Sequence, residues 1–205
     1  MGTLPYYIGA YLAGSIPFGW LITKAKGVDI RRIGSGNIGA TNVGRALGRK
    51  YAILVFLLDF MKGYLPVMLT KSLLVSTGQG ASSAWQLIVV ALLAVAGHNY
   101  PVWLKFKGGK GVATSMGALM ALLPGPALIT LAVWVLVFSS FRYVSLASLA
   151  SIVSLPVSTL FLKPELPYLI LTATLTILSF IRHRSNIRAL LSGTEHQFKK
   201  EDASP

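Results

Sequence analysis

Residues 51–72 read YAILVFLLDFMKGYLPVMLTKS, an apolar run long enough to cross a bilayer as one α-helix, which takes about 20 residues. Near its middle, the charged residues Asp59 and Lys62 lie three positions apart, a spacing that lets them pair on one face of a helix. Similar runs recur along the chain, which is 54% hydrophobic and 12% charged over its 205 residues. A soluble domain would carry about 25% charged residues. We therefore expect an all-α, polytopic integral membrane protein.

The apolar runs predict seven transmembrane helices, over residues 4–23, 51–72, 84–103, 112–123, 127–141, 145–162 and 166–181. The fourth is short for a straight crossing, and two prolines at 124 and 126 follow it. A five-span arrangement in which residues 112–141 are partly re-entrant is therefore an open alternative.

The chain shows no internal repeat and no linker, so we expect one membrane domain over residues 1–205, with a mobile tail over 197–205. The first run lacks a basic segment before it and a small-residue cleavage site after it, which indicates a retained helix. The absence of cysteine excludes disulfides, thiolate catalysis and cysteine-ligated metals.

The basic residues predict the orientation. The chain has 19 Lys and Arg residues against 6 Asp and Glu residues, a net charge of +13. Apart from Lys62, Lys71 and Lys163, all of these cations lie in alternate connections of the seven-span arrangement. Basic connections remain cytoplasmic. We therefore expect the N-terminus outside and the C-terminus in the cytoplasm.

Four polar segments fall on the predicted cytoplasmic side: residues 34–45, 108–111, 142–148 and 182–195. The first contains a G-x-G-x-x-G pattern with Asp59 placed 20 residues after its last glycine, as in dinucleotide-binding proteins. No strand precedes it, however, and Asp59 lies inside a predicted span, so a Rossmann fold is excluded. The second is no Walker A loop, because glycine rather than Ser or Thr follows Lys110.

The chemistry of glycine loops still applies to both segments. Glycine allows successive backbone N–H groups to approach an anion, while lysine adds a point charge and arginine a planar fork. Lys110 and Arg45 beside these loops therefore predict a phosphorylated ligand. Turn formation is the alternative role for Asn37 and Asn42. Glu195 either holds an arginine in place, touches substrate or is solvated surface.

These segments resemble one family, the bacterial acyl-phosphate:glycerol-3-phosphate acyltransferases of the PlsY type. The resemblance rests on GSGNIGATNVGRALG from Gly34, GHNYPVWLKFKGGKGVATSMG from Gly97, RYVSLASLAS from Arg142 and RHRSNIRALLSGTEH from Arg182. It implies a seven-helix enzyme of the bacterial cytoplasmic (inner) membrane whose active site faces the cytoplasm. Such an enzyme transfers a fatty acyl group from acyl phosphate to the 1-hydroxyl of sn-glycerol 3-phosphate, giving lysophosphatidic acid and phosphate.

The resemblance and the loop chemistry together nominate the site residues. We expect catalytic roles for Lys110, Ser148, His183 and Asn186. We expect substrate-binding roles for Ser35, Gly36, Asn37, Arg45, Gly108, Gly109, Gly111 and Glu195. No metal, cofactor or nucleic acid is expected, and the partners are the two substrates and membrane lipid.

One position departs from the family pattern. The family's last motif usually reads N-I-x-R-L, but here Arg188 stands one position early and Ala189 takes the usual place of the arginine. One position on a helix is a rotation of about 100°. We therefore do not assign Arg188 to the site.

The residues favour direct attack of the hydroxyl on acyl phosphate, because the chain has no cysteine and no H-x-x-x-x-D pair. Arg45, Lys110 and His183 would hold glycerol phosphate, and Asn186 and Ser148 would orient it. The glycine-loop amides would hold the donor phosphate and the oxyanion. The departing phosphate is one candidate proton acceptor, and neutral His183 is the rival. A transporter or channel for a phosphorylated anion is the alternative function.

Overall fold

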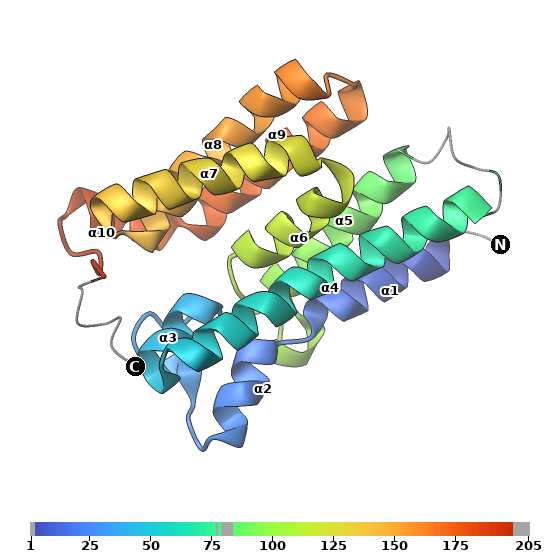
Figure 1. Ribbon diagram of the computed structural model, residues 1–205. Helices are drawn as coiled ribbons and strands as arrows, with labels where there is room; N and C mark the ends of the chain where they lie inside the picture. The colour runs from blue at the N-terminus through green and yellow to red at the C-terminus, as the bar shows by residue number, and fades with distance from the viewer. Residues whose placement is uncertain (1–2, 77, 79–83, 199–205) are drawn as a thin grey trace. The chain divides into compact units, whose positions relative to one another are not determined.

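A computed structural model describes the chain except for residues 1–2, 77, 79–83 and 199–205. The described residues form α-helices and short 3-10 helices, with no β-strand among them (Figure 1). The predicted all-α class is therefore confirmed. Most of the tail predicted over 197–205 lies outside the described residues. Its first two residues are held, since Gln197 Nε2 donates to Phe141 O (3.1 Å) and Phe198 N to Arg142 O (2.9 Å).

Contacts divide the chain into two units, which meet in sequence between Leu122 and Leu123. The first unit contains α1 (Leu4–Ser15), α2 (Phe18–Ala25), η1 (Ile30–Arg32), α3 (Ala40–Leu47), α4 (Arg49–Ser76), α5 (Ala84–Asn99), η3 (Val102–Leu104) and α6 (Val112–Leu122). The second contains α7 (Pro124–Phe141), α8 (Val144–Leu162), α9 (Leu166–Arg182) and α10 (Arg184–Leu191).

Within the described residues, four helical segments are long and apolar enough to cross a membrane: Arg49–Ser76, Ala84–Leu104, Pro124–Phe141 and Val144–Leu162. Helices α9 and α10 together form a fifth candidate, bent by 60°. Helix α6 is apolar but has only 11 residues. The count of seven spans therefore stays a prediction.

The helix predicted over 4–23 is in fact two helices. Helix α1 ends at Ser15, and Ile16 is extended (φ −61°, ψ 115°), the conformation favoured for a residue before proline. Helix α2 starts only after Pro17. The hydropathy of the run is continuous through this point, so hydropathy alone could not reveal the break.

Small residues allow the helices of the first unit to approach closely. Helix α4 runs alongside α1 and α6 (Figure 1). A Cβ on Gly63 of α4 would overlap the backbone of Thr114, and a Cβ on Gly117 of α6 would overlap the backbone of Phe60. Such small residues let backbones meet where helices lack a hydrophobic driving force in lipid. This contact fixes the start of α6, and with it the glycine loop that precedes α6.

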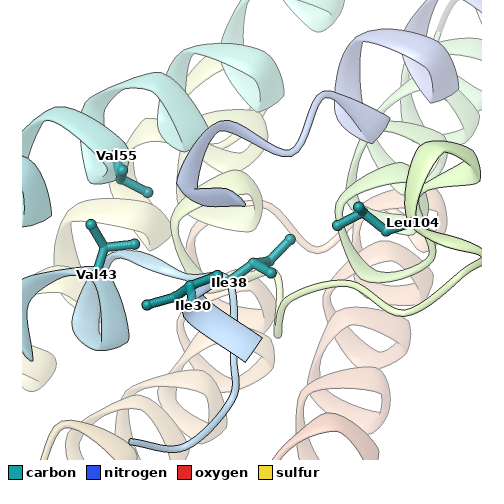
Figure 2. Close-up of a cluster of buried hydrophobic side chains, with 5 residues drawn as sticks. All are labelled: Ile30, Ile38, Val43, Val55 and Leu104. Carbon is teal, nitrogen blue, oxygen red and sulfur yellow. The ribbon is translucent and has the colours of Figure 1, made fainter. Parts of the chain in front are cut away.

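A hydrophobic cluster joins the two polar loops of the first unit. Ile30, Ile38 and Val43 come from the segment that contains the first polar loop, residues 34–45, which we call the opening loop. Val55 comes from α4 and Leu104 from η3 (Figure 2). Each of these side chains is at most 8% exposed. The cluster therefore packs residues 30–43 against the segment that leads into the glycine loop at 108–111.

Candidate active site

The opening loop is held together by the side chain of Asn42, which is 2% exposed. Its Nδ2 donates to the carbonyl oxygens of Ile30 (3.2 Å), Ile33 (2.9 Å) and Asn37 (2.9 Å). Its Oδ1 accepts the N–H of Ser35 at 3.2 Å. Asn42 thus satisfies the backbone of a loop that has no regular hydrogen-bond ladder. The turn-forming alternative is what the structure shows for this residue.

The predicted binding residues of this loop lie around the hydrogen bonds of Asn42. Ser35 is exposed, between Gly34 (φ 54°) and Gly36 (φ 67°), both in the left-handed region that suits glycine. Asn37 is half-buried, and its Oδ1 accepts the N–H of Gly39 (2.9 Å) just before α3. Arg45 lies on α3, and its Cδ would be 3.6 Å from a Cβ on Gly34. Ser35 and Arg45 are therefore close together at one end of the loop.

The glycine loop is docked on the end of α5. Gly109 N donates to His98 O at 3.1 Å, and Gly108 N donates to Asn99 O at 3.2 Å. These two amides, which we expected to bind phosphate, thus make backbone hydrogen bonds. Gly111 (φ 84°) turns the chain into α6, whose first N–H groups have no partner within the helix. An anion site here would use Lys110 and the first turn of α6.

In the second unit, His183 marks the bend between α9 and α10 and is 2% exposed. Its Nδ1 is 2.9 Å from Ser179 O. A carbonyl oxygen only accepts, so Nδ1 carries the proton, and in a neutral ring Nε2 is the basic nitrogen. The contact favours the neutral tautomer that a general base would need, with the proton on Nδ1.

Glu195 joins α8 to α10. Its Oε1 accepts from Ser145 Oγ (2.9 Å) and from Asn186 Nδ2 (2.9 Å), and its Oε2 lies 3.2 Å from the same Nδ2. The chain returns to this position because Gly193 (φ 68°) ends α10 with a left-handed turn. Glu195 thus binds an amide and a hydroxyl of the protein, a role that none of the three sequence alternatives described. Only the NH₂ of Asn186 can face a carboxylate, so the amide orientation is set.

Ser148 is 4% exposed on α8. Its Oγ donates to Val144 O at 2.8 Å and accepts from Trp134 Nε1 at 3.2 Å. The contact of Trp134 with Ser148 was not predicted from the sequence. The contact of Ser145 with Glu195 was not predicted either. Trp134 and Ser145 both carry polar groups in a span, which is the signal that could have identified them.

The predicted site residues therefore fall into two groups. The opening and glycine loops, with Ser35, Asn37, Arg45 and Lys110, belong to the first unit. Ser148, His183, Asn186 and Glu195 belong to the second. Among the described residues, no three His, Asp or Glu side chains gather as a metal site would require.

Comparisons with known proteins identify the family. The model for the family described as glycerol-3-phosphate acyltransferase matches residues 4–193. The chain is 46% identical over 198 residues to the glycerol-3-phosphate acyltransferase of Aquifex aeolicus (strain VF5), covering 97% of this chain and 100% of that protein. It is 45% identical over 194 residues to the protein of the same name from Desulforamulus reducens, covering 94% of each.

Two solved structures have the same fold. They are crystal structures of PlsY (YgiH), an integral membrane glycerol 3-phosphate acyltransferase, one in a glycerol 3-phosphate form and one in a lysophosphatidic acid form. Each is 44% identical to this chain, and the TM-scores are 0.91 and 0.87. The matches cover 99% and 98% of this chain and 98% of each of those chains. This multi-pass membrane protein therefore belongs to the glycerol-3-phosphate acyltransferase family.

Proposed function

We propose that this enzyme transfers a fatty acyl group from acyl phosphate to the 1-hydroxyl of sn-glycerol 3-phosphate, releasing lysophosphatidic acid and inorganic phosphate. The observation that carries the proposal is the match along nearly the whole chain to PlsY, whose crystal structures are of glycerol 3-phosphate and lysophosphatidic acid forms. One is the acceptor and the other is the product of this transfer. Family membership replaces the alternative of an anion transporter.

The reaction requires little covalent chemistry from the protein, because acyl phosphate is already an activated mixed anhydride. The protein must place the hydroxyl near the carbonyl carbon and stabilise the oxyanion. We assign Arg45 and Lys110 to the phosphates as cationic partners. Ser35 and the first turn of α6 supply neutral donors beside them, in place of the Gly108 and Gly109 amides.

Asn186 and Ser148 would orient the attacking hydroxyl. Because the NH₂ of Asn186 faces Glu195, a substrate hydroxyl would donate to the Oδ1 of this amide. His183 Nε2 either accepts the hydroxyl proton or, when protonated, binds phosphate. Ser148 then acts through its hydroxyl oxygen, which already accepts from Trp134.

The activity is tested with protein purified in detergent, acyl phosphate and glycerol 3-phosphate, with released phosphate as the readout. We expect phosphate release that depends on glycerol 3-phosphate, and none when acyl-CoA replaces acyl phosphate. Release of coenzyme A from acyl-CoA at a comparable rate would contradict the proposed donor. The absence of phosphate release at every concentration of glycerol 3-phosphate would contradict the proposed reaction.

The variant His183→Gln distinguishes between the two roles proposed for His183, general base and phosphate binding. If neutral His183 is the general base, the variant loses a kinetic pKa of about 6–7 from its kcat profile. If the departing phosphate takes the proton, the shape of the profile is unchanged and the KM for glycerol 3-phosphate rises. We favour the second outcome, since the leaving phosphate is a base placed next to the hydroxyl.

We further propose seven spans, an outward N-terminus and an active site that faces the cytoplasm of a bacterial inner membrane. The support is the placement of nearly all cations in alternate connections. The chain contains no cysteine, so single-cysteine labelling has no background. A membrane-impermeant maleimide should label Lys163→Cys in intact cells, and should label Lys107→Cys only after the membrane is opened. The reverse pattern would invert the topology.

A further inference from the structure

A buried cluster of ionisable side chains lies within the helices of the first unit, away from the two polar loops in sequence. Asp59 and Lys62 are on α4 and His98 is in the last turn of α5, and they are 3%, 6% and 4% exposed. Placing charged groups inside a membrane helix is costly, and such residues are as a rule tied to function. The proposed reaction assigns no role to any of the three.

The cluster has a defined geometry. Lys62 Nζ is 2.8 Å from Asp59 Oδ1 and donates to Ile16 O at 2.7 Å. His98 Nδ1 is 3.6 Å from the same Oδ1 of Asp59. The carboxylate thus lies between a lysine and an imidazole. Through Ile16 O, the lysine also holds the break between α1 and α2, where the chain turns toward the opening loop.

The other side of the imidazole lies against the glycine loop. A Cβ on Gly109 would overlap His98 Nε2, so the ring packs directly on the Gly109 backbone. The backbone repeats this contact, because Gly109 N donates to His98 O at 3.1 Å. The side chain of Asn99 packs next to it on Gly111, since its Oδ1 would be 2.8 Å from a Cβ on Gly111. The residues on both sides of Lys110 are therefore packed against the end of α5.

We propose that Asp59 and His98 are positioning residues of the acyltransferase, which act through the glycine loop on Lys110. Asp59 orients the imidazole through Nδ1, and the ring then supports Gly109 and sets the path of the next residue. Neither side chain touches substrate in this arrangement. The inference rests on the proposed role of Lys110 as a phosphate partner.

The test is a set of double-mutant cycles. Asp59→Asn removes the charge that orients the ring, and His98→Asn keeps a donor near Asp59 but withdraws the ring from Gly109. Each is combined with Lys110→Ala, and kcat and KM are measured for both substrates in detergent. We expect each single variant to lower kcat/KM by roughly 10- to 100-fold, the range that a displacement of about 1 Å produces. In the Lys110→Ala background we expect the further loss to be less than about threefold.

Thr70→Ala is the matched control, since Thr70 is buried on the same helix and its hydroxyl donates within that helix, to Pro66 O at 2.8 Å. Thr70→Ala should leave kcat/KM unchanged, both in the wild-type protein and in the Lys110→Ala background. Losses that multiply fully with Lys110→Ala would overturn the inference, as would full activity of folded Asp59→Asn and His98→Asn. Failure of both variants to fold while Thr70→Ala folds would show a purely structural cluster, and would overturn it too. If Lys110→Ala alone keeps full activity, the error lies in the proposed function instead.

Discussion

Replacing Asn42 tests how the opening loop is built. This side chain, 2% exposed, donates to three backbone carbonyls and accepts one backbone N–H. Asn42→Ala removes all four contacts and leaves two partly buried backbone groups, Asn37 O and Ser35 N–H, without this partner. We therefore expect a protein that still inserts in the membrane but is less stable, with the opening loop loosened around Ser35 and Asn37.

The size of the effect follows from which groups lose their partner. The carbonyls of Ile30 and Ile33 keep another donor, because they also accept backbone N–H groups at 3.3 Å and 2.9 Å. The loss therefore falls mainly on Asn37 O and Ser35 N–H. Leaving a buried polar group unsatisfied costs roughly 1–3 kcal/mol, and both groups are only partly buried, so we expect roughly 2–4 kcal/mol in total. For a chain of this size that lowers Tm by roughly 5–15 °C.

Asn42→Asp makes the prediction sharper. Aspartate keeps an acceptor for Ser35 N–H but loses the amide donor and sets a carboxylate against three carbonyl oxygens. We expect it to be less stable than Asn42→Ala, because a buried charge without a partner costs about several kcal/mol. Thermal unfolding in detergent is the measurement, and Thr23→Val is the control, since the Thr23 hydroxyl donates within its own helix to Gly19 O. Equal Tm values for wild type and Asn42→Ala, or a more stable Asn42→Asp, would refute the reasoning.

Three further predictions concern the second unit. Glu195→Ala should lower kcat/KM by roughly 10-fold or more, because it releases Asn186. Glu195→Gln should lower kcat/KM less, because its side-chain carbonyl still accepts the hydrogen bond. Adding Glu195→Ala to Asn186→Ala should change kcat/KM little. Trp134→Phe removes the indole N–H that donates to α8, and should cost roughly 0.5–1.5 kcal/mol of stability in thermal unfolding, with the stacking on Phe138 kept. The hydrogen bond and ion pair with Lys163 (2.8 Å) lower the pKa of Glu165 from 4.5, so this pair adds stability above that pH and loses it as the pH falls through the lowered pKa. The Tm difference between wild type and Glu165→Gln should therefore be present at pH 7 and disappear in acid; a difference that persists below pH 3 would contradict it.

The helices were largely predictable, because apolar runs in a membrane protein have one viable backbone structure. The run at 51–72 appears as α4, Arg49–Ser76, and the run at 145–162 as α8, Val144–Leu162. The break after Ser15 was not predicted, since it depends on the backbone before Pro17 rather than on hydropathy. The pairing of Asp59 with Lys62, suggested by spacing, is confirmed at 2.8 Å.

The candidate site was predictable in its residue types but not in its contacts. Glycine loops and cations indicate a phosphate ligand whatever the fold, because the chemistry is local. Which amides are already used depends on distant segments: Gly109 N meets His98 O from α5. The link between Glu195 and Ser145 joins residues 50 positions apart, a contact that no local pattern encodes. Sequence reasoning therefore assigned to substrate some groups that the protein uses itself.

The polar groups divide between the protein and the substrate because the site is formed by irregular backbone beside a membrane. Such backbone leaves carbonyl and N–H groups that helices would otherwise satisfy, and in a dry surrounding each must find a partner. Asn42 supplies these partners in the opening loop, and the carbonyls of His98 and Asn99 supply them in the glycine loop. The polar residues of these loops are thus of two kinds, those that complete the backbone and those that face substrate. Burial and hydrogen bonding to backbone place Asn42 in the first kind, and the exposure of Ser35 fits the substrate-binding role that we propose for it.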